Sequence, residues 1–284
     1  MTRGLARADR VRFVSDLLRT LGAADVRATA TTATGDATRA ARDARDAGAD
    51  RVIVWGGDGT LNEVASVLVG SRVPIGIVAG GSGNGVARGL GLPLDVTAAV
   101  TVAMTGSPRD IDTGLVDGRT FLNLAGMGLD AAVAQRFNTA NTRRGLGPYV
   151  SSILHEWRTF ESQRFSLQLD DAPSVEVHAH VVAVCNGQQY GHGARIAPDA
   201  AFDDGWLDVV AVPPITTMRI VRHGWRLFHG TLTRVPGVFA GRARRVTIAQ
   251  ERPLALHLDG EVIAPARTRT FEVRPHSLRV LVPA

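Results

Sequence analysis

The chain has 284 residues, of which 45% are hydrophobic and 21% are charged, so it can bury a sizeable core and is not globally disordered. All 32 basic residues are arginine, which excludes mechanisms that need a lysine, such as those of the Walker A loop and the Schiff base. Neither a long apolar run nor a secretory signal is present, and Cys185 is the single cysteine, so we expect a cytoplasmic protein without a membrane-spanning helix.

The first part of the chain alternates between helical patterns and short apolar strands. Apolar spacing predicts helices at residues 5–22, within 31–50, at 61–69, beginning at 86–90 and at 96–104, and strands near Val26, at 51–55 and at 74–78. Strands of this apolar kind, alternating with helices, form parallel sheets that bind ligands at the carboxyl ends of the strands. We therefore expect an N-terminal α/β domain with a ligand site at the glycines that follow its strands.

Strand patterns dominate the rest of the chain. They occupy residues 121–126, 165–170, 175–187, 206–213, 245–249, 254–262 and 278–283, and helical spacing interrupts them at 147–160 and 215–229. Turn residues between the runs are typical of an antiparallel sandwich or barrel. The change of pattern predicts an α/β domain at residues 1–110 and a β-rich sandwich domain at 111–284, whose last strand could return to the first domain.

The most specific motif is the string GGDGT at residues 56–60, which leaves an apolar strand and enters a helix. Its glycines let backbone amides approach a polyphosphate closely, and the helix start adds N–H groups and partial positive charge. The carboxylate of Asp58 would repel phosphate unless it holds Mg²⁺ between itself and the nucleotide. The alternative is a tight turn in which Asp58 caps the helix, and the whole string GGDGTLNE weighs against it.

A second glycine loop, GGSGN at residues 80–84, follows the next parallel strand. It offers a ligand the hydroxyl of Ser82 and the carboxamide of Asn84, and Arg88 could reach a phosphate from one turn into the next helix. Two such loops after successive strands predict a nucleotide-binding crevice.

Two acidic clusters lie in the second half of the chain, Asp259-Gly260-Glu261 and the string DDGWLD at residues 203–208. Asp-Gly forms turns readily, so a hairpin turn explains the first cluster and a turn between strands explains the second. Close-set carboxylates could instead bind a cation with help from backbone carbonyls. The residues alone leave these alternatives open.

An arginine-rich segment follows. Residues 213–250 contain seven arginines and no acidic residue, and Met218, Val221, Trp225 and Phe228 recur on one helical face within it. The segment could dock on an anionic membrane, or it could cover the sheet with its arginines in solvent.

These motifs together resemble the diacylglycerol kinase catalytic domain family, which includes bacterial lipid kinases and sphingosine kinases and, more distantly, NAD kinases. The strings that carry the resemblance are GGDGTLNEV (56–64), PIGIVAGGSGNGVARGLGLP (74–93), RDIDTG (109–114), FLNLAGMGLDA (121–131), DDGWLD (203–208) and LDGE (258–261). The resemblance implies a nucleotide-binding domain followed by a β-rich lipid-substrate domain, ATP as co-substrate and Mg²⁺ as cofactor. It implies a lipid kinase that acts on diacylglycerol or a related lipid at the inner face of the membrane.

The resemblance also assigns roles to residues. The positions that match nucleotide or Mg²⁺ contacts are Thr31, Gly56, Gly57, Asp58, Gly59, Thr60, Leu61, Asn62, Glu63 and Ser82. Glu261, with Asp259 beside it, matches the general base. Asp204 matches a structural Mg²⁺ ligand, with the carbonyls of Ala201 and Trp206 as helpers, and Asp112 matches a residue near that metal or near the lipid head group.

One departure bears on activity. Relatives usually begin with a strand and an Asn-Pro-x-Ser-Gly loop that contacts the nucleotide, whereas this chain starts in what resembles the following helix. This departure leaves a catalytically weak nucleotide- or lipid-binding protein as one alternative to a lipid kinase. The other alternative is an NAD-kinase-like enzyme, which shares the GGDGT string. A net charge of +5 without a recognition motif does not support a nucleic-acid partner, and a homodimer remains open.

Overall fold

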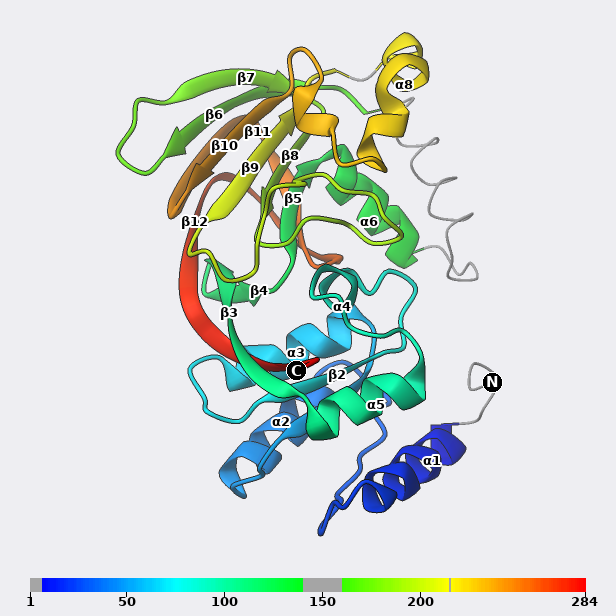
Figure 1. Cartoon of the computed structure of the whole chain (residues 1–284). Coiled ribbons are helices and arrows are strands. Elements are labelled where there is room, and N and C mark those ends of the chain that lie inside the picture. Colours follow the sequence, from blue (N-terminus) through cyan, green and yellow to red (C-terminus); the bar gives the residue numbers. More distant parts are fainter. Residues whose placement is uncertain (1–6, 140–159, 215) are drawn as a thin grey trace. The chain divides into compact units, whose positions relative to one another are not determined.

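The computed structural model describes residues 7–139, 160–214 and 216–284, which form two compact units (Figure 1). The first unit comprises residues up to Ile111 together with Ser277–Ala284, and the second comprises Asp112–His276. The chain passes between the units within two strands, β3 (Ser107–Val116) and β12 (Glu261–Val282). Each unit has a buried apolar core of its own.

The first unit is a small parallel sheet packed with helices. Its elements are α1 (Arg7–Thr20), α2 (Asp36–Asp46), β1 (Val52–Gly56), α3 (Asp58–Leu68), β2 (Ile75–Ala79), α4 (Gly85–Gly89) and α5 (Val96–Thr105). β1 and β2 are parallel neighbours, and β12 adds to β2 in parallel at Val280. The first four residues of β2 are buried, as expected for a strand covered on both faces.

The helices and the two later strands predicted for this unit are confirmed to within a few residues. The strand expected near Val26 is wrong, because residues 25–32 form no strand. Val26 is partly buried and packs with α1 and α5 against a core that includes Leu18 and Val100. Its apolar side chain therefore serves helix packing and has no neighbouring strand to pair with.

The second unit is mainly antiparallel. Its elements besides β3 and β12 are β4 (Arg119–Phe121), β5 (Leu124–Gly128), α6 (Leu129–Thr139), β6 (Gln163–Leu169), β7 (Val175–Ala179), β8 (Val181–Cys185), β9 (Leu207–Val212), α8 (Thr217–His223), the 3₁₀ helices η1 (Gly224–Leu227) and η2 (Leu232–Arg234), β10 (Phe239–Ala243) and β11 (Arg245–Leu258).

The long strand β11 organises this unit. Its first part pairs with β6, and its end pairs with β5 after register shifts between Ala249 and Leu256. From β5 the sheet continues through β8 and β9 to β10 (Figure 1). Phe121, Phe165 and Phe271 are fully buried in the core between these strands. The β-rich sandwich expected after the α/β domain is confirmed.

The details of the second unit depart from the sequence expectation in several places. The run at 175–187 is two strands, because β7 pairs with β6 whereas β8 pairs with β5 and β9. Helix α6 and strand β10 were not expected. The helix predicted at 147–160 lies outside the described residues, and the one predicted at 215–229 is α8 followed by η1. No helix in the described ranges is long and apolar enough to cross a membrane.

Candidate active site

The two glycine loops of the first unit touch each other at the ends of β1 and β2. The Gly80 amide donates to the Gly56 carbonyl at 2.8 Å, which extends the parallel pairing by one residue. A Cβ atom on Gly81 would lie 2.6 Å from the Cα atom of Gly57, and one on Gly57 would lie 3.2 Å from the Cα atom of Gly81. Only glycine fits at this contact, so the two loops form one continuous backbone surface.

The second loop is held in shape by its own asparagine. The Gly81 amide donates to the Asn84 side-chain oxygen, the Asn84 amide donates back to the Gly81 carbonyl, and both distances are 2.9 Å. Asn84 itself has a left-handed backbone, with φ of 52°. Arg88 donates through Nε to the Gly83 carbonyl at 3.1 Å, so it braces this loop, and Ser82 is exposed.

Helix α3 starts inside the first glycine motif. Gly57 is its N-cap, Asp58, Gly59 and Thr60 form its first turn, and the Leu61 amide makes the first bond of the helix, to the Gly57 carbonyl at 3.0 Å. The first N–H groups of a helix have no acceptor within it and attract anions. The motif therefore presents backbone donors beside the carboxylate of Asp58, as a phosphate site with a bound cation requires.

Several other residues that were expected to contact the nucleotide make contacts within the first unit itself. Glu63 accepts from the Gly35 amide at 3.0 Å and from the Thr38 amide at 3.3 Å, so it joins α3 to the start of α2. The Leu61 side chain is buried in the core, which gives it a packing role. Thr31 lies in the loop before α2. Asn62 accepts from the Ser66 hydroxyl at 3.3 Å.

In the second unit, Asp259 and Gly260 are the two central residues of a hairpin between β11 and β12. Both have positive φ, 50° and 94°, which is the backbone that Asp-Gly hairpin turns adopt. The Asp259 carboxylate accepts three backbone N–H groups from the β4–β5 segment, those of Leu122 at 2.7 Å, Asn123 at 2.9 Å and Leu124 at 3.0 Å. Asp259 therefore holds this hairpin against the neighbouring strand.

Glu261, at the other end of the turn, is different. Its side chain is 65% exposed, and it pairs with Arg119 Nη1 at 3.4 Å. Arg119 is itself more than half exposed, so solvent weakens this ion pair. Of the two carboxylates, Glu261 is the one that a substrate hydroxyl could reach.

A buried polar cluster beneath this hairpin was not expected from the sequence. Tyr190 donates its hydroxyl to Asp130 Oδ2 at 2.9 Å, and His257 Nε2 lies 3.3 Å from the same oxygen. The Gly260 amide donates to His257 Nδ1 at 3.4 Å, so the ring proton belongs on Nε2, facing Asp130. The cluster supports the turn that carries Glu261, and its partners are too far apart in sequence to be identified from it.

Asp112 is fully buried, so it is not placed to meet a lipid head group directly. Its carboxylate accepts from the Gly205 amide at 2.6 Å and from the His276 amide at 2.8 Å. Its own amide donates to the Phe202 carbonyl at 2.6 Å. Asp112 thus fixes the acidic loop at 203–208 from below.

A Mg²⁺ site at Asp204, with the carbonyls of Ala201 and Trp206, stays a prediction, and in the structure the Asp204 carboxylate has protein partners. One Asp204 oxygen pairs with Arg242 Nη2, and the other accepts from the Trp206 amide at 3.1 Å. The guanidinium supplies the positive charge that a metal ion would bring. Across the described ranges, no group of three or more His, Cys, Asp or Glu residues is arranged to hold a metal ion.

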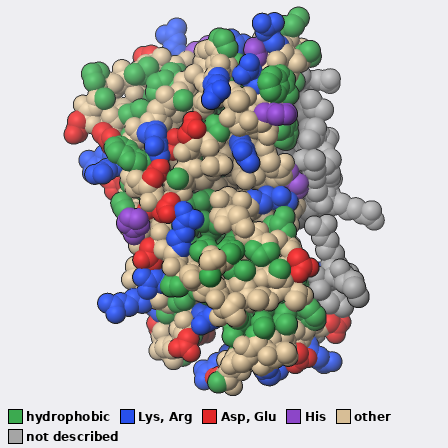
Figure 2. Space-filling view, viewed as in Figure 1, with side chains coloured by type: hydrophobic (Ala, Val, Ile, Leu, Met, Phe, Trp, Pro, Cys, Tyr) green, Lys and Arg blue, Asp and Glu red, His purple; other side chains and the backbone are tan. Residues whose placement is uncertain are grey.

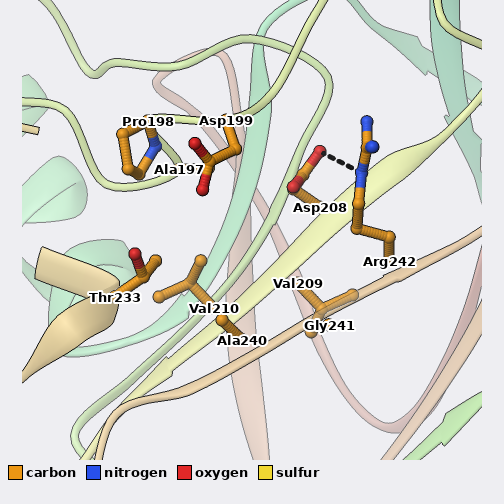
Figure 3. Close-up of a pocket in the computed structure, with 10 residues that line it drawn as sticks. All are labelled: Ala197, Pro198, Asp199, Asp208, Val209, Val210, Thr233, Ala240, Gly241 and Arg242. Carbon is orange, nitrogen blue, oxygen red and sulfur yellow. Dashed lines mark ion pairs between the residues drawn. The ribbon is translucent and has the colours of Figure 1, made fainter. Parts of the chain in front are cut away.

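Arg242 also pairs with Asp208, at 3.3 Å from Nε, beside a cavity of about 150 Å³ (Figure 3). The cavity is lined by Ala197, Pro198, Asp199, Asp208, Val209, Val210, Thr233, Ala240, Gly241 and Arg242. Burial raises the pKa of Asp208 to about 6, while Arg242 opposes the rise and Asp204 adds to it. The sequence singles out Asp204 and Asp208 in the string DDGWLD, but it does not indicate that Arg242 of β10 is their partner.

Both parts of the chain are similar to known proteins. Residues 4–116 match the diacylglycerol kinase catalytic domain, and residues 123–282 match the YegS C-terminal NAD kinase beta sandwich-like domain. A protein of Chromohalobacter salexigens named "Probable lipid kinase YegS-like" is 34% identical, over 80% of this chain and 74% of its own. The diacylglycerol kinase of Mycobacterium tuberculosis strain H37Rv is 30% identical, over 83% of this chain and 78% of its own. A solved diacylglycerol kinase structure from Bacillus anthracis shares the fold, with a TM-score of 0.71 at 21% identity, and covers 93% of this chain and 87% of its own.

Proposed function

Because the chain belongs to the diacylglycerol kinase family of lipid kinases, we propose that it transfers the γ-phosphate of ATP to a hydroxyl group of a membrane lipid. The observation that carries this proposal is the contact between the two glycine loops, where no side chain fits between Gly57 and Gly81. Backbone amides at such a surface suit a polyphosphate. In this proposal the first unit binds ATP and the second binds the lipid.

The nucleotide would lie on the two loops. Its proposed contacts are the backbone at Gly56, Gly57, Gly59, Thr60 and Leu61, the side chains of Thr31, Asn62, Glu63 and Ser82, and Asp58 with its metal ion. Mg²⁺ is commonly held by one or two carboxylates together with substrate phosphates, and Asp58 at the start of α3 fits that donor set. When bound there, Mg²⁺ would neutralise charge on the phosphate oxygens.

The lipid hydroxyl would lose its proton to Glu261. Its exposed carboxylate accepts the proton as the hydroxyl oxygen attacks the γ-phosphate, the bond from the γ-phosphorus to the bridging oxygen breaks and ADP leaves. Asp259 has no proton-transfer role in this scheme, because its three backbone partners hold it as the anchor of the turn. The loop amides would stabilise the charge on the transferring group, which is where most of the catalysis of phosphoryl transfer arises.

The proposed acceptor is diacylglycerol or a related lipid with a hydroxyl group near its head group. The relative from Mycobacterium tuberculosis is named a diacylglycerol kinase, whereas the one from Chromohalobacter salexigens is named only a lipid kinase. We propose that the protein meets this acceptor at the inner face of the membrane, as a peripheral protein.

The test is incubation with γ-labelled ATP and Mg²⁺ in the presence of separate acceptors, followed by chromatography of the products. The acceptors are diacylglycerol, ceramide, a sphingoid base and phosphatidylglycerol, with NAD as the acceptor of the alternative enzyme class. Label in an organic-phase lipid product supports the proposal. Label in NADP, or in no acceptor while the protein binds ATP, would contradict it.

A further inference from the structure

Helix α8 and η1 form an exposed surface of mixed character in the second unit, called here the α8 surface. Its apolar members are Met218, Val221, Trp225 and Phe228, its exposed basic members are Arg219 and Arg222, and the half-buried Arg226 lies beside them. Hydrophobic and basic side chains lie next to each other over α8 in the space-filling view (Figure 2). Within the described part of the chain, neither α8 nor η1 contains a buried residue.

The apolar side chains stand in solvent to an unusual degree. Met218 is 73% exposed, Val221 75%, Trp225 50% and Phe228 55%. Met218 and Val221 are three residues apart in α8, and Trp225 and Phe228 are three residues apart in η1 and just after it, so the members of each pair share a side of their helical turn. Several large apolar side chains gathered on one exposed face mark an interaction site more often than scattered single ones do.

The segment is fixed to the second unit from its other side. Leu227 of η1 and Leu232 of η2 pack against a buried cluster that includes Leu124 and Val181. The Leu227 carbonyl accepts from the Arg195 amide at 2.8 Å. The residues that anchor the segment are therefore distinct from the exposed apolar ones.

The charge on this surface has one sign. Residues 216–239 contain four arginines, Arg219, Arg222, Arg226 and Arg234, and no acidic residue. Arg242 and Arg245 of the following strands pair with acidic residues and do not belong to this surface. Arg219 donates to the Pro236 carbonyl at 3.2 Å, and Arg226 stacks on the Trp225 ring at 5.0 Å, and neither contact neutralises the charge. Burial, and then the nearby charges of the three arginines, lower the pKa of His223, as the positive potential of these arginines requires.

We infer that the α8 surface binds a bilayer that contains anionic lipid, with its apolar side chains in the head-group region and its arginines on lipid phosphates. A tryptophan and arginines beside aliphatic side chains are the composition that interfacial segments use. Charge complementarity selects an anionic bilayer as the occupant over a second copy of this chain, whose matching surface would carry the same positive charge. The inference rests on the proposed function only in that the acceptor is a membrane lipid.

The test uses the full chain without ATP or acceptor, so that a failure of the kinase proposal does not affect it. The protein is sedimented with vesicles of phosphatidylcholine alone and of phosphatidylcholine mixed with phosphatidylglycerol. We expect binding to the anionic vesicles only, weakened by salt. Each change of Arg219→Gln or Arg222→Gln should lower the partition coefficient roughly fivefold, and Val221→Ser with Trp225→Ser should lower it at least about tenfold.

Matched controls lie on the same unit. Val175→Ser replaces another exposed apolar residue, 45% exposed on β7, and Arg164→Gln replaces an exposed arginine of β6. Neither should change vesicle binding, and circular dichroism should show that all variants fold. Equal binding to neutral vesicles, no binding by the wild type, or losses in the controls as large as those in the α8 variants would overturn the inference. So would light scattering that shows a dimer which Val221→Ser with Trp225→Ser converts to a monomer.

A kinase assay adds a second readout if the proposed function holds. The α8 variants should keep wild-type turnover on a short-chain, water-soluble diacylglycerol and lose turnover on long-chain diacylglycerol in anionic vesicles. Equal loss on both acceptors would place the defect in the active site and contradict a docking role.

Discussion

The two carboxylates of the hairpin between β11 and β12 should separate into a structural residue and a chemical one when each is changed to its amide. Asp259→Asn keeps an oxygen for the N–H groups of Asn123 and Leu124 but turns an NH₂ group toward the N–H of Leu122. A buried donor left without its acceptor costs about 1–3 kcal/mol, and the loss of the negative charge weakens the other two bonds. We expect the free energy of unfolding to fall by about 3 kcal/mol.

Glu261→Gln should have the opposite profile. Glu261 and Arg119 are both more than half exposed, and such a pair contributes at most about 1 kcal/mol. The variant should therefore unfold within a few degrees of the wild type. If Glu261 takes the proton of the acceptor, its turnover should fall by roughly 100-fold or more.

The assay is thermal unfolding by circular dichroism alongside turnover on a lipid acceptor. For a unit of this size, about 3 kcal/mol corresponds to a melting temperature lower by about 6–12 °C. Two results would refute the division of roles. One is an Asp259→Asn variant as stable as the wild type, and the other is a Glu261→Gln variant with full kcat.

Two further predictions concern the glycine loops and the acidic loop. Gly81→Ala would place a Cβ atom 2.6 Å from the Gly57 Cα atom, so the two loops must separate. ATP affinity measured by titration should then fall at least about tenfold. Unchanged affinity would contradict the proposed site. The pKa of Asp208 is raised from 3.8 to about 6, so the folded state holds the proton longer than the unfolded chain, and stability falls as the pH rises through this range. Asp208→Asn should therefore gain stability relative to the wild type between about pH 4 and pH 6, by at most about 3 kcal/mol, and urea unfolding that shows a pH-independent difference would contradict the assignment.

The local elements of the first unit could be predicted from sequence because each carries its own periodic signal. The helix at 96–104 has buried apolar residues on one side and an N-cap at Asp95, which accepts from the Ala98 amide. The strand near Val26 failed because one apolar residue next to helices looks the same as a short strand. In the run at 175–187, the break at His180 could not be seen, because it depends on which strands are the neighbours.

The candidate site also combines features with a local sequence signal and features that depend on distant partners. The glycine loops were identifiable because their chemistry is contained in a few consecutive residues. The anchoring roles of Asp112 and Asp259 were not, because their partners lie 93 to 164 and 135 to 137 residues away. The pairing of Asp204 with Arg242 could not be predicted either, because Arg242 lies 38 residues further along the chain.

The central claim is that ATP bound on the glycine loops donates its phosphate to a lipid, with Asp58 holding the metal ion. The most direct measurement is transfer of label from γ-labelled ATP to diacylglycerol in mixed micelles by the wild type and by Asp58→Asn, with folding of both checked by circular dichroism. The account predicts a labelled lipid from the wild type and a loss of roughly 1000-fold or more in the folded variant. Equal transfer by both proteins, or none by a wild type that is folded and supplied with Mg²⁺, would contradict it.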